Sequence, residues 1–568
     1  MNNNPILKKK IFLYITEFVS GIAVMGVETA ASRLLAPYFS SSQIVWTLII
    51  GTILIAMSIG NILGGKMADK HNNVTRLYVL LLIAGAYICI IPLFGRYVIA
   101  LVSAFFALFV ESNLLIWSSL LSCLILFVPP LLICGMVTPS LIKFTISNDS
   151  NNGSIVGRLE ALNTIGSIIG TFIPTFISIP TIGTNATFGL FGSLIVIISL
   201  IYLIVGFINE IKANKKLKEN NDNEGTARKA NSSNKVMACR ILLLSSMSLI
   251  SILGFIFSLK AKFVFWQDDT LKNEEESMYN YLQLKEDSQA TYFSTNVMFG
   301  VQSMMKHDKS LTGMYYDYCL AAPYMANYQN KDKTDMLILG NGTGTYATLV
   351  DKYIPSNKSI TGIEIDQKII NYSYKYFQMP ESVEVICDDG RAYLNRNTKK
   401  YDVIMVDAYS SISTPFQMST IEFFRLVKSH LKDDGVMVMN INMIGNESNT
   451  LDKALSDTVF DSFNYIYKIP VAKGSGDELF ASNNPDFINN LNNSIDNITD
   501  SSIKNHMQYV SNNLNKYQDS GIRLTDDNAD VERRSIEAVD YIIQNELQFY
   551  RDIYHNKGFK GLLEYLLG

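Results

Sequence analysis

The chain has 568 residues, which is too many for one ordinary domain, and 48% of them are hydrophobic while 18% are charged. A formal net charge of −4 lacks the basic excess of nucleic-acid-binding proteins, so we expect no nucleic acid among the partners. The six cysteines include no Cys-x-x-Cys pair, which argues against a zinc site and a disulfide framework, and we expect no bound metal.

Residues 11–207 are almost continuously apolar and predict a multi-pass transmembrane helical bundle over 1–207. A spanning helix needs about 20 apolar residues. Apolar stretches of about that length lie at 11–36, 43–63, 77–95, 115–138, 158–178, 186–206 and 239–259. A shorter stretch at 97–110 either lies at the interface or adds a span, so we expect seven or eight crossings and membrane lipid as a partner.

Two further segments follow this bundle. A polar basic linker covers 208–238, and a final hydrophobic helix covers 239–266. Lys8–Lys10 place the N-terminus in the cytoplasm, because short loops rich in Lys and Arg stay on that side. The linker should lie there for the same reason, and a crossing by the final helix would then place the rest of the chain outside.

Residues 334–490 predict a Rossmann-like α/β domain, because short buried strands alternate with helical patterns. The expected strands are Met336–Leu339, Ser359–Ile365, Val383–Ile386, Tyr401–Val406 and Val436–Ile441. The expected helices are Tyr346–Tyr353, Gln367–Phe377, Arg391–Arg396 and Thr420–Leu431, and Asp433-Asp434-Gly435 would stop the last one. Such alternation gives a parallel, doubly wound sheet that binds ligands at the carboxyl ends of its strands.

A glycine-rich turn follows the first of these strands and precedes a helix. Gly340, Gly342 and Gly344 let a ligand approach the backbone closely beside the helix N-terminus. Glu364 ends the second strand about 20 residues later, where a carboxylate can accept hydrogen bonds from both hydroxyls of a ribose. A solvated strand end is the alternative, and we favour the ribose role because the glycine turn is in register with it.

Acidic residues also follow the third and fourth strands. Asp388 and Asp389 suit both a hydrogen bond from an adenine amino group and a helix N-cap, and each aspartate can take one of these roles. Asp407 ends the fourth strand, where the reacting part of the ligand would lie. Acids at three successive strand ends predict a nucleoside site more strongly than any one of them.

Several segments give the chain a family resemblance. They are Glu276–Asn280, Gly300–Ser303, Leu311–Asp317, Asp389–Leu394, Tyr401–Tyr409 and Pro415–Phe424. Through them, residues 275–447 resemble the spermidine synthase family of polyamine aminopropyltransferases, specifically its membrane-fused bacterial branch. The resemblance implies a class I methyltransferase-type fold with a small N-terminal β-subdomain over 267–333. We expect a C-terminal helical extension over 491–568.

The resemblance implies a transferase of polyamine biosynthesis. It would move an aminopropyl group from decarboxylated S-adenosylmethionine (or use S-adenosylmethionine itself) as co-substrate, without a metal, to a diamine such as putrescine. Gln302 would contact the methionine-derived part of the nucleoside, while the ribose and adenine fall to the acids named above. Tyr279, Tyr316 and Asp317 would face the amine. A homodimer is a candidate assembly.

Two positions depart from the family pattern. Thr343 in the glycine turn and Ser410, three residues after Asp407, stand where polyamine-forming members usually have Asp. Asp407 is then the best candidate for the base that takes a proton from the amine, since Ser410 can only orient an amine or a water. A purely structural Asp407 is the alternative. Two other functions stay open: another S-adenosylmethionine-dependent enzyme, a methyltransferase or a lyase, and a non-catalytic sensor of nucleosides or polyamines.

S-adenosyl nucleosides are cytosolic metabolites, so we expect the soluble domain in the cytoplasm despite the charge of the linker. This placement requires an even number of crossings or a last segment that does not cross. Near the end of the chain we expect one more strand at Glu478–Ala481 and a surface loop over the Asn-rich stretch 484–500.

Overall fold

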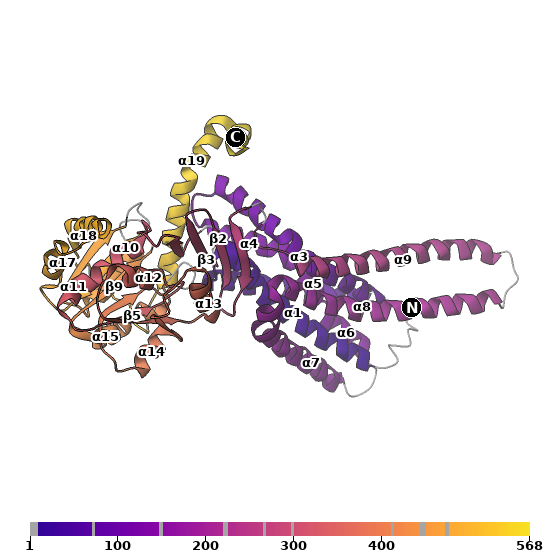
Figure 1. Ribbon diagram of the computed structural model, residues 1–568. Helices are drawn as coiled ribbons and strands as arrows, with labels where there is room; N and C mark the ends of the chain where they lie inside the picture. Colours follow the sequence, from indigo (N-terminus) through magenta and orange to yellow (C-terminus); the bar gives the residue numbers. More distant parts are fainter. Residues whose placement is uncertain are drawn as a thin grey trace. The chain divides into compact units, whose positions relative to one another are not determined.

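The computed structural model describes residues 10–567, except for short stretches at 71–73, 147–151, 220–224, 265–267, 297–299, 410–413, 443–449 and 472–475. The chain forms two compact units (Figure 1). Unit 1 holds Met1–Phe106 and Leu115–Gln267, and unit 2 holds Ala107–Leu114 and Asp268–Gly568. The described part of unit 1 is helical, and both sheets lie in unit 2.

The helices of unit 1 follow one another through short connections. They are α1 (Ile11–Phe39), α2 (Gln43–Lys70), α3 (Val74–Phe109), α4 (Leu114–Leu126), α5 (Val128–Gly135), α6 (Val137–Thr145), α7 (Asn152–Ile173), α8 (Ile179–Glu219) and α9 (Gly225–Ser258). Six stretches among the described residues are long and apolar enough to cross a membrane. One of them, 152–212, has 61 residues and would be about 90 Å long if straight, three times the hydrocarbon thickness. Gly183, with φ +81°, interrupts the helical backbone and divides this stretch into two segments, each longer than the about 20 residues that a crossing needs.

Two predicted spans differ from what the structure contains. Most of the stretch 97–110 continues the preceding span within the single helix α3, so the described residues form no separate helix there. The predicted span 115–138 is divided among α4, α5 and α6. Pro129 and Pro130 lie at the break, where proline removes amide donors and interrupts an α-helix.

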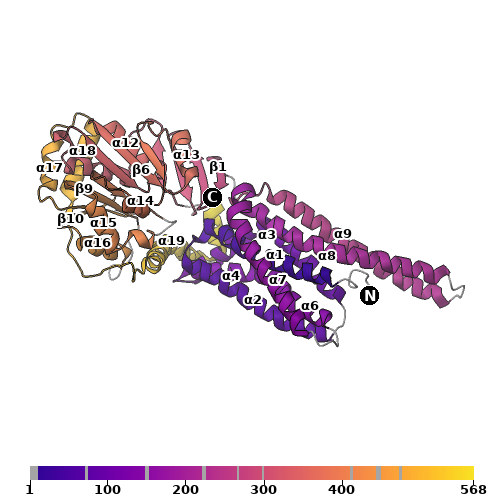
Figure 2. The same ribbon diagram turned by 90° about the horizontal axis from the view of Figure 1, so that it is seen from below.

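The last two helices of unit 1 lie side by side and antiparallel (Figures 1 and 2). Arg240 of α9 forms an ion pair with Glu210 of α8 at 2.6 Å, and the Asn185 side chain of α8 donates to the carbonyl of Ala261 after α9, at 2.9 Å. These contacts lie at opposite ends of the bundle, so α9 runs its full length. The described residues of the predicted linker 208–238 belong to these two helices.

Contacts at the two ends of α1 show which helix ends lie together at each end of the bundle. Phe12 at the start of α1 stacks on Tyr202 near the Glu210 end of α8, with ring centroids 6.4 Å apart. At the other end of α1, the Tyr38 hydroxyl donates to the carbonyl of Phe263 at 2.7 Å. The chain therefore leaves unit 1 at the end opposite to the start of α1.

We call the end where α1 starts the basic end, because the helix ends and connections there carry Lys10, Lys66, Lys70, Arg76, Lys143, Lys212 and Arg240. Arg96 lies at the opposite end, where its guanidinium donates to the carbonyl of Lys262 after α9. Lys143 of α6 forms an ion pair with Asp69 near the end of α2, with nitrogen and oxygen 2.9 Å apart, so α2 and α6 lie close together there. The described chain has six long apolar stretches, or seven segments if 152–212 is counted twice, so the side of the soluble domain stays a prediction.

Unit 2 begins with a small antiparallel sheet. Its strands are β1 (Leu271–Glu276), β2 (Tyr281–Glu286), β3 (Ala290–Thr295) and β4 (Ser303–Lys306), paired in that order. Leu282, Leu284 and Phe293 on its inner face pack against Tyr372 and Phe377, which belong to the larger sheet's α13 and the residue after it. The expected β-rich segment before residue 334 is therefore present.

The larger sheet has eight strands in the order β12-β10-β11-β9-β8-β5-β6-β7. They are β5 (Thr334–Leu339), β6 (Lys358–Glu364), β7 (Glu384–Cys387), β8 (Tyr401–Val406), β9 (Leu431–Ile441), β10 (Tyr465–Pro470), β11 (Asp477–Ser482) and β12 (Asn515–Lys516). The pairs from β7 to β9 are parallel, and β11, β10 and β12 are added antiparallel. The predicted doubly wound α/β fold is confirmed, with an antiparallel edge that its sequence pattern did not reveal.

Helices cover both faces of this sheet (Figure 1). They are α10 (Tyr315–Cys319), α11 (Ala321–Met325), α12 (Thr345–Tyr353), α13 (Gln367–Tyr376), α14 (Gly390–Arg396), α15 (Ile421–Ser429), α16 (Leu451–Phe460), α17 (Phe487–Ile495) and α18 (Ser501–Asn513). The long helix α19 (Val531–Leu567) follows, with Val531 at its start packed in one of the cores. Met336 and Ile338 of β5 enter one core with Leu491 of α17, whereas Leu337 enters the other with Phe423 of α15. Alternate residues of a strand point to opposite faces, so a wholly apolar strand such as β5 is buried on both sides.

Two sequence-based boundaries in unit 2 are corrected. Strand β9 starts at Leu431 and includes Asp433-Asp434-Gly435, the residues expected to stop the preceding helix, which already ends at Ser429. The register with β8 shifts there. The Asn-rich stretch 484–500 is not a loop throughout, because it contains α17. Phe487, Leu491 and Ile495 recur every four residues and are buried, which is the spacing of one helix face.

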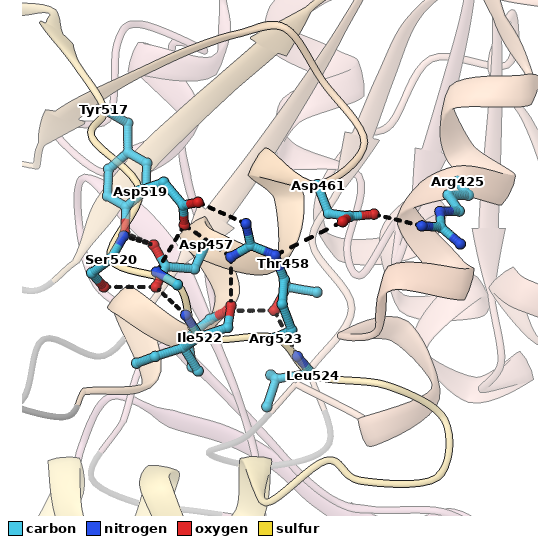
Figure 3. Close-up of polar contacts among 12 residues, drawn as sticks. Arg425, Asp457, Thr458, Asp461, Tyr517, Asp519, Ser520, Ile522, Arg523 and Leu524 are labelled. Atoms are coloured by element: carbon cyan, nitrogen blue, oxygen red, sulfur yellow. Dashed lines mark hydrogen bonds and ion pairs between the residues drawn. The ribbon is translucent and has the colours of Figure 1, made fainter.

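A polar cluster fastens the segment after β12 to helix α16 (Figure 3). The buried carboxylate of Asp457 accepts hydrogen bonds from the Tyr517 hydroxyl, from the Ser520 amide and hydroxyl, and from the Ile522 amide, at 2.7–2.9 Å. The neighbouring Thr458 hydroxyl accepts from the Leu524 amide at 3.1 Å. Four donors satisfy this one carboxylate, so its burial is compensated.

Candidate functional site

The glycine-rich turn after β5 brings three strand ends together. Gly340, Gly342 and Gly344 all have positive φ, between +52° and +86°, which only glycine adopts without strain. The amides of Gly340 and Asn341 both donate to the carbonyl of Ile363 in β6, at 2.9 Å. A Cβ on Gly340 would lie 2.5 Å from the carbonyl oxygen of Asp407, so glycine there allows the turn to pack on the end of β8.

Glu364 closes this turn from the neighbouring strand. Its Oε2 accepts from the Gly342 amide at 2.9 Å, and its Oε1 accepts from the Asp366 amide at 3.1 Å. Burial raises the pKa of Glu364 to about 7, partly offset by these amide hydrogen bonds. Each carboxylate oxygen has two lone pairs, so both can still accept from ligand hydroxyls.

The two aspartates after β7 have separate partners. Asp389 is the N-cap of α14, with its side chain accepting from the Ala392 amide at 2.8 Å, and Asp388 forms an ion pair with Arg396. The predicted capping role therefore belongs to Asp389, the same residue to which the family resemblance assigns adenine. Because the cap engages one oxygen, a ligand amino group can still use the other.

Asp407 lies where β8 ends, between donors from two other elements. The Tyr315 hydroxyl of α10 donates to its Oδ2 at 2.6 Å, and the Asn440 amide of β9 donates to its Oδ1 at 2.9 Å. Burial raises the pKa of Asp407 to about 7, and the charge of Glu364 adds to this effect. A carboxylate with a pKa near neutrality can both exist as the anion and take up a proton at physiological pH.

The remaining predicted residues are placed as follows. The Gln302 side chain pairs with the backbone of Thr295, donating to its carbonyl and accepting from its amide. The Tyr316 hydroxyl donates to the carbonyl of Gln302 at 2.6 Å. Tyr279 is 46% exposed, in the turn between β1 and β2, and no contact joins it to Asp407 among the described residues. Ser410 lies outside the described residues.

Asp317 has a structural task in the loop before α10. Its carboxylate accepts from the Thr312 amide and hydroxyl at 3.0 Å and from the Gly313 amide at 2.6 Å. Burial raises its pKa. These three hydrogen bonds hold the turn before α10, and the contact of Asp317 with the amine stays a prediction.

Sequence reasoning missed Tyr315 and Asn440, the two partners of Asp407. Tyr315 is one residue before the tyrosine that was singled out, and helix direction decides which of them reaches Asp407. Asn440 carried a usable signal, because it lies near the carboxyl end of the strand next to β8 in a parallel sheet. Strand order, which the sequence does not state, was needed to see it.

Comparisons with known proteins identify the family to which the chain is similar. A family described as "Spermine/spermidine synthase domain" matches residues 318–490. A protein of Bifidobacterium longum described as "Probable polyamine aminopropyl transferase" is 44% identical over 318 residues, which cover 53% of this chain and 70% of that protein. A polyamine aminopropyltransferase of Thermoanaerobacter sp. is 28% identical over 171 residues, which cover 28% of this chain and 60% of that protein.

Among solved structures, a probable spermidine synthase from Corynebacterium glutamicum is 24% identical, with a TM-score of 0.33, over 37% of this chain and 80% of that one. The family assignment depends on the B. longum relative, whose identity and coverage are both high. The chain is therefore a transferase that belongs to the polyamine aminopropyltransferase family, the family of spermidine synthases.

Proposed function

We propose that the chain transfers the aminopropyl group of decarboxylated S-adenosylmethionine to a diamine such as putrescine. The observation that carries this proposal is the position of Asp407, a carboxylate of raised pKa held by Tyr315 and Asn440 beside the glycine turn and Glu364. A base next to a nucleoside pocket is what amine alkylation by a sulfonium requires.

The nucleoside would bind at the carboxyl ends of the strands. Glu364 would accept hydrogen bonds from the ribose hydroxyls, and Asp389 would accept one from the adenine amino group. The glycine turn would let the nucleoside approach the backbone. The Gln302 side chain would have to leave the backbone of Thr295 to reach the methionine-derived part, which makes it the weakest member of this set.

The chemical step would be one displacement at carbon. The neutral amine nitrogen attacks the methylene carbon bonded to the sulfonium sulfur, and the new C–N bond forms as the C–S bond breaks. The electron pair of that bond stays on sulfur, which becomes a neutral thioether. An alkylamine is mostly protonated at neutral pH, as Lys is, so Asp407 would take the proton that the nitrogen loses.

Product analysis tests this proposal. The full-length protein in detergent is incubated with a diamine and either decarboxylated or intact S-adenosylmethionine, and products are identified by mass spectrometry. We expect a polyamine and a thioether nucleoside with the decarboxylated donor alone. Thr343 and Ser410, which replace the usual aspartates, favour the second candidate, a methyltransferase or a lyase, and products from the intact donor would establish it. Nucleoside binding without products from either donor would identify a sensor.

We also propose that unit 1 spans a membrane with its basic end in the cytoplasm, following the usual bias of Lys and Arg. The supporting observations are the six long apolar stretches of the described chain, one of them divided at Gly183, and the contacts that pair α9 with α8 near both ends of α9. Unit 2 would then be on the opposite side, which reverses the side expected from co-substrate supply. The aminopropyl donor would have to be present there.

Cysteine labelling in intact cells tests this orientation. Cys387 is exposed, whereas Cys319 is buried, so the reporter is a variant that retains Cys387 alone. A membrane-impermeant thiol reagent should label it without lysis. Labelling only after permeabilisation would return unit 2 to the cytoplasm, and a cysteine-free variant is the background control.

A further inference from the structure

Three polar side chains form a row across neighbouring strands of the large sheet. The register of β8 and β9 pairs Val406 with Met439, so Asp407 follows beside Asn440, and the register of β9 and β11 pairs Asn440 with Glu478. The apolar neighbours of this row, Met439 and Leu479 among them, enter the core on the other face. Asp407, Asn440 and Glu478 therefore lie on the same face, because strand residues alternate.

Glu478 is buried without adequate partners. Its side chain is 0% exposed, and its Oε2 accepts from the Cys319 thiol with sulfur and oxygen 3.1 Å apart. Its Oε1 has no hydrogen-bond partner in the described part of the chain. Burial raises the pKa of Glu478 well above its ordinary value, and the charge of Asp407 adds to the effect. A thiol is a weak donor, so this carboxyl group has unused capacity to bind a cation.

We propose that Glu478 binds the far ammonium group of the diamine while Asp407 serves the amine that reacts. This inference rests on the proposed aminopropyl transfer and names the acceptor class as a short α,ω-diamine. Neighbouring strands are about 4.8 Å apart, so the backbones of Asp407 and Glu478 are about 10 Å apart across Asn440. The nitrogens of an extended four-carbon diamine are ~6 Å apart for bonds of ~1.5 Å, which leaves room for one side chain at each end.

The chemistry suits a cation more than any other occupant. A second positive charge beside Glu478 favours its ionised form and makes a charge-assisted hydrogen bond in a site removed from water. A monoamine would leave Glu478 as it is in the free protein. Glu478 would then distinguish diamines from monoamines, in a chain that has Ser410 in place of the second aspartate near Asp407.

The test compares two acceptors in the full-length protein supplied with the aminopropyl donor. One is 1,4-diaminobutane, and the other is 1-aminobutane, which lacks the far ammonium. Glu478→Gln should lower kcat/KM for the diamine about 10- to 100-fold, the loss expected for a buried hydrogen bond to a charged group. Its kcat/KM for the monoamine should remain within about threefold of wild type, since that acceptor never reaches Glu478. Glu384→Gln, an exposed acid on β7, is the matched control and should change neither.

A second variant keeps the carboxylate but shortens its reach. Glu478→Asp should shift the preferred acceptor from 1,4-diaminobutane toward 1,5-diaminopentane, and it carries the test if Glu478→Gln does not fold. Equal losses for both amines in Glu478→Gln, or an unchanged preference, would assign Glu478 to folding alone and leave the proposed function standing. If the wild type uses no amine at all, the proposed function fails and this inference fails with it.

Discussion

Two buried carboxylates of unit 2 are satisfied to very different degrees. Asp457 on α16 accepts four hydrogen bonds from the segment after β12 (Figure 3), whereas Glu478 on β11 has one thiol donor and an oxygen without a partner among the described residues. The fold therefore supplies hydrogen bonds that compensate the burial of Asp457, but it leaves the carboxyl group of Glu478 without enough donors. A buried acid that the fold itself satisfies indicates a structural joint, and one that the fold leaves incomplete indicates a place for a ligand.

Asp407 stands between these two cases, and its replacement should have the largest effect. Asp407→Asn keeps the shape and the contacts with Tyr315 but removes the proton acceptor. We expect turnover of the amine to fall about a hundredfold to ten-thousandfold, while nucleoside affinity changes little. Steady-state kinetics together with calorimetry measure both quantities. Turnover within about threefold of wild type, below that expected range, would show that Asp407 is a structural acid like Asp457.

Asp457 should matter for stability and not for the reaction. Asp457→Ala leaves four donors without their acceptor and should lower the free energy of unfolding of unit 2 by about 3 kcal/mol. Chemical denaturation of the detergent-solubilised protein measures the loss. Asp461→Ala is the control, because its ion pairs with Arg425 and Arg523 involve partly exposed groups and each should contribute less than about 1 kcal/mol. If both variants lose the same free energy of unfolding, the four hydrogen bonds of Asp457 contribute no more to stability than the ion pairs of Asp461.

Glu364 has both a structural role and a proposed role in ligand binding. It holds the glycine turn, and its oxygens have lone pairs left for a ligand. Glu364→Ala should weaken binding of the S-adenosyl nucleoside by about 1.5–3 kcal/mol, the range for hydrogen bonds to a charged group. Calorimetry on the full-length protein measures this change. Wild-type affinity in the variant would exclude Glu364 from the ribose site.

The pH dependence of stability should follow the incompletely satisfied acids. The folded-state pKa of both Asp407 and Glu364 is raised to about 7, so the folded protein binds more protons than the unfolded chain between about pH 4 and 7. Stability should therefore decrease as pH rises through this window. Asp407→Asn should melt a few degrees higher than wild type at pH 8 and lose this advantage at pH 4. A melting curve with the same pH profile in both proteins would contradict the raised pKa.

Much of the fold follows from local sequence patterns. Strand β8 begins and ends where the apolar run Tyr401–Val406 does, and α12 and β6 are within one residue of their predicted limits, because buried strands and glycine turns have short-range signals. The pattern was insufficient for 484–500, where asparagines on the exposed face concealed the buried face of α17. Hydropathy likewise did not show the break before α5, which Pro129 and Pro130 explain, or the continuity of α3.

For the site, the sequence determined which acids stand at strand ends, since Glu364, Asp389 and Asp407 each follow a recognisable strand. Only the tertiary structure decided what each acid contacts. Asn440 reaches Asp407 because β9 lies next to β8, and Glu478 joins the same row because β11 is added antiparallel to β9 in one register. Such neighbours are far apart in the sequence, and a shift of one residue in register would turn Glu478 to the opposite face, so no local pattern can encode the row.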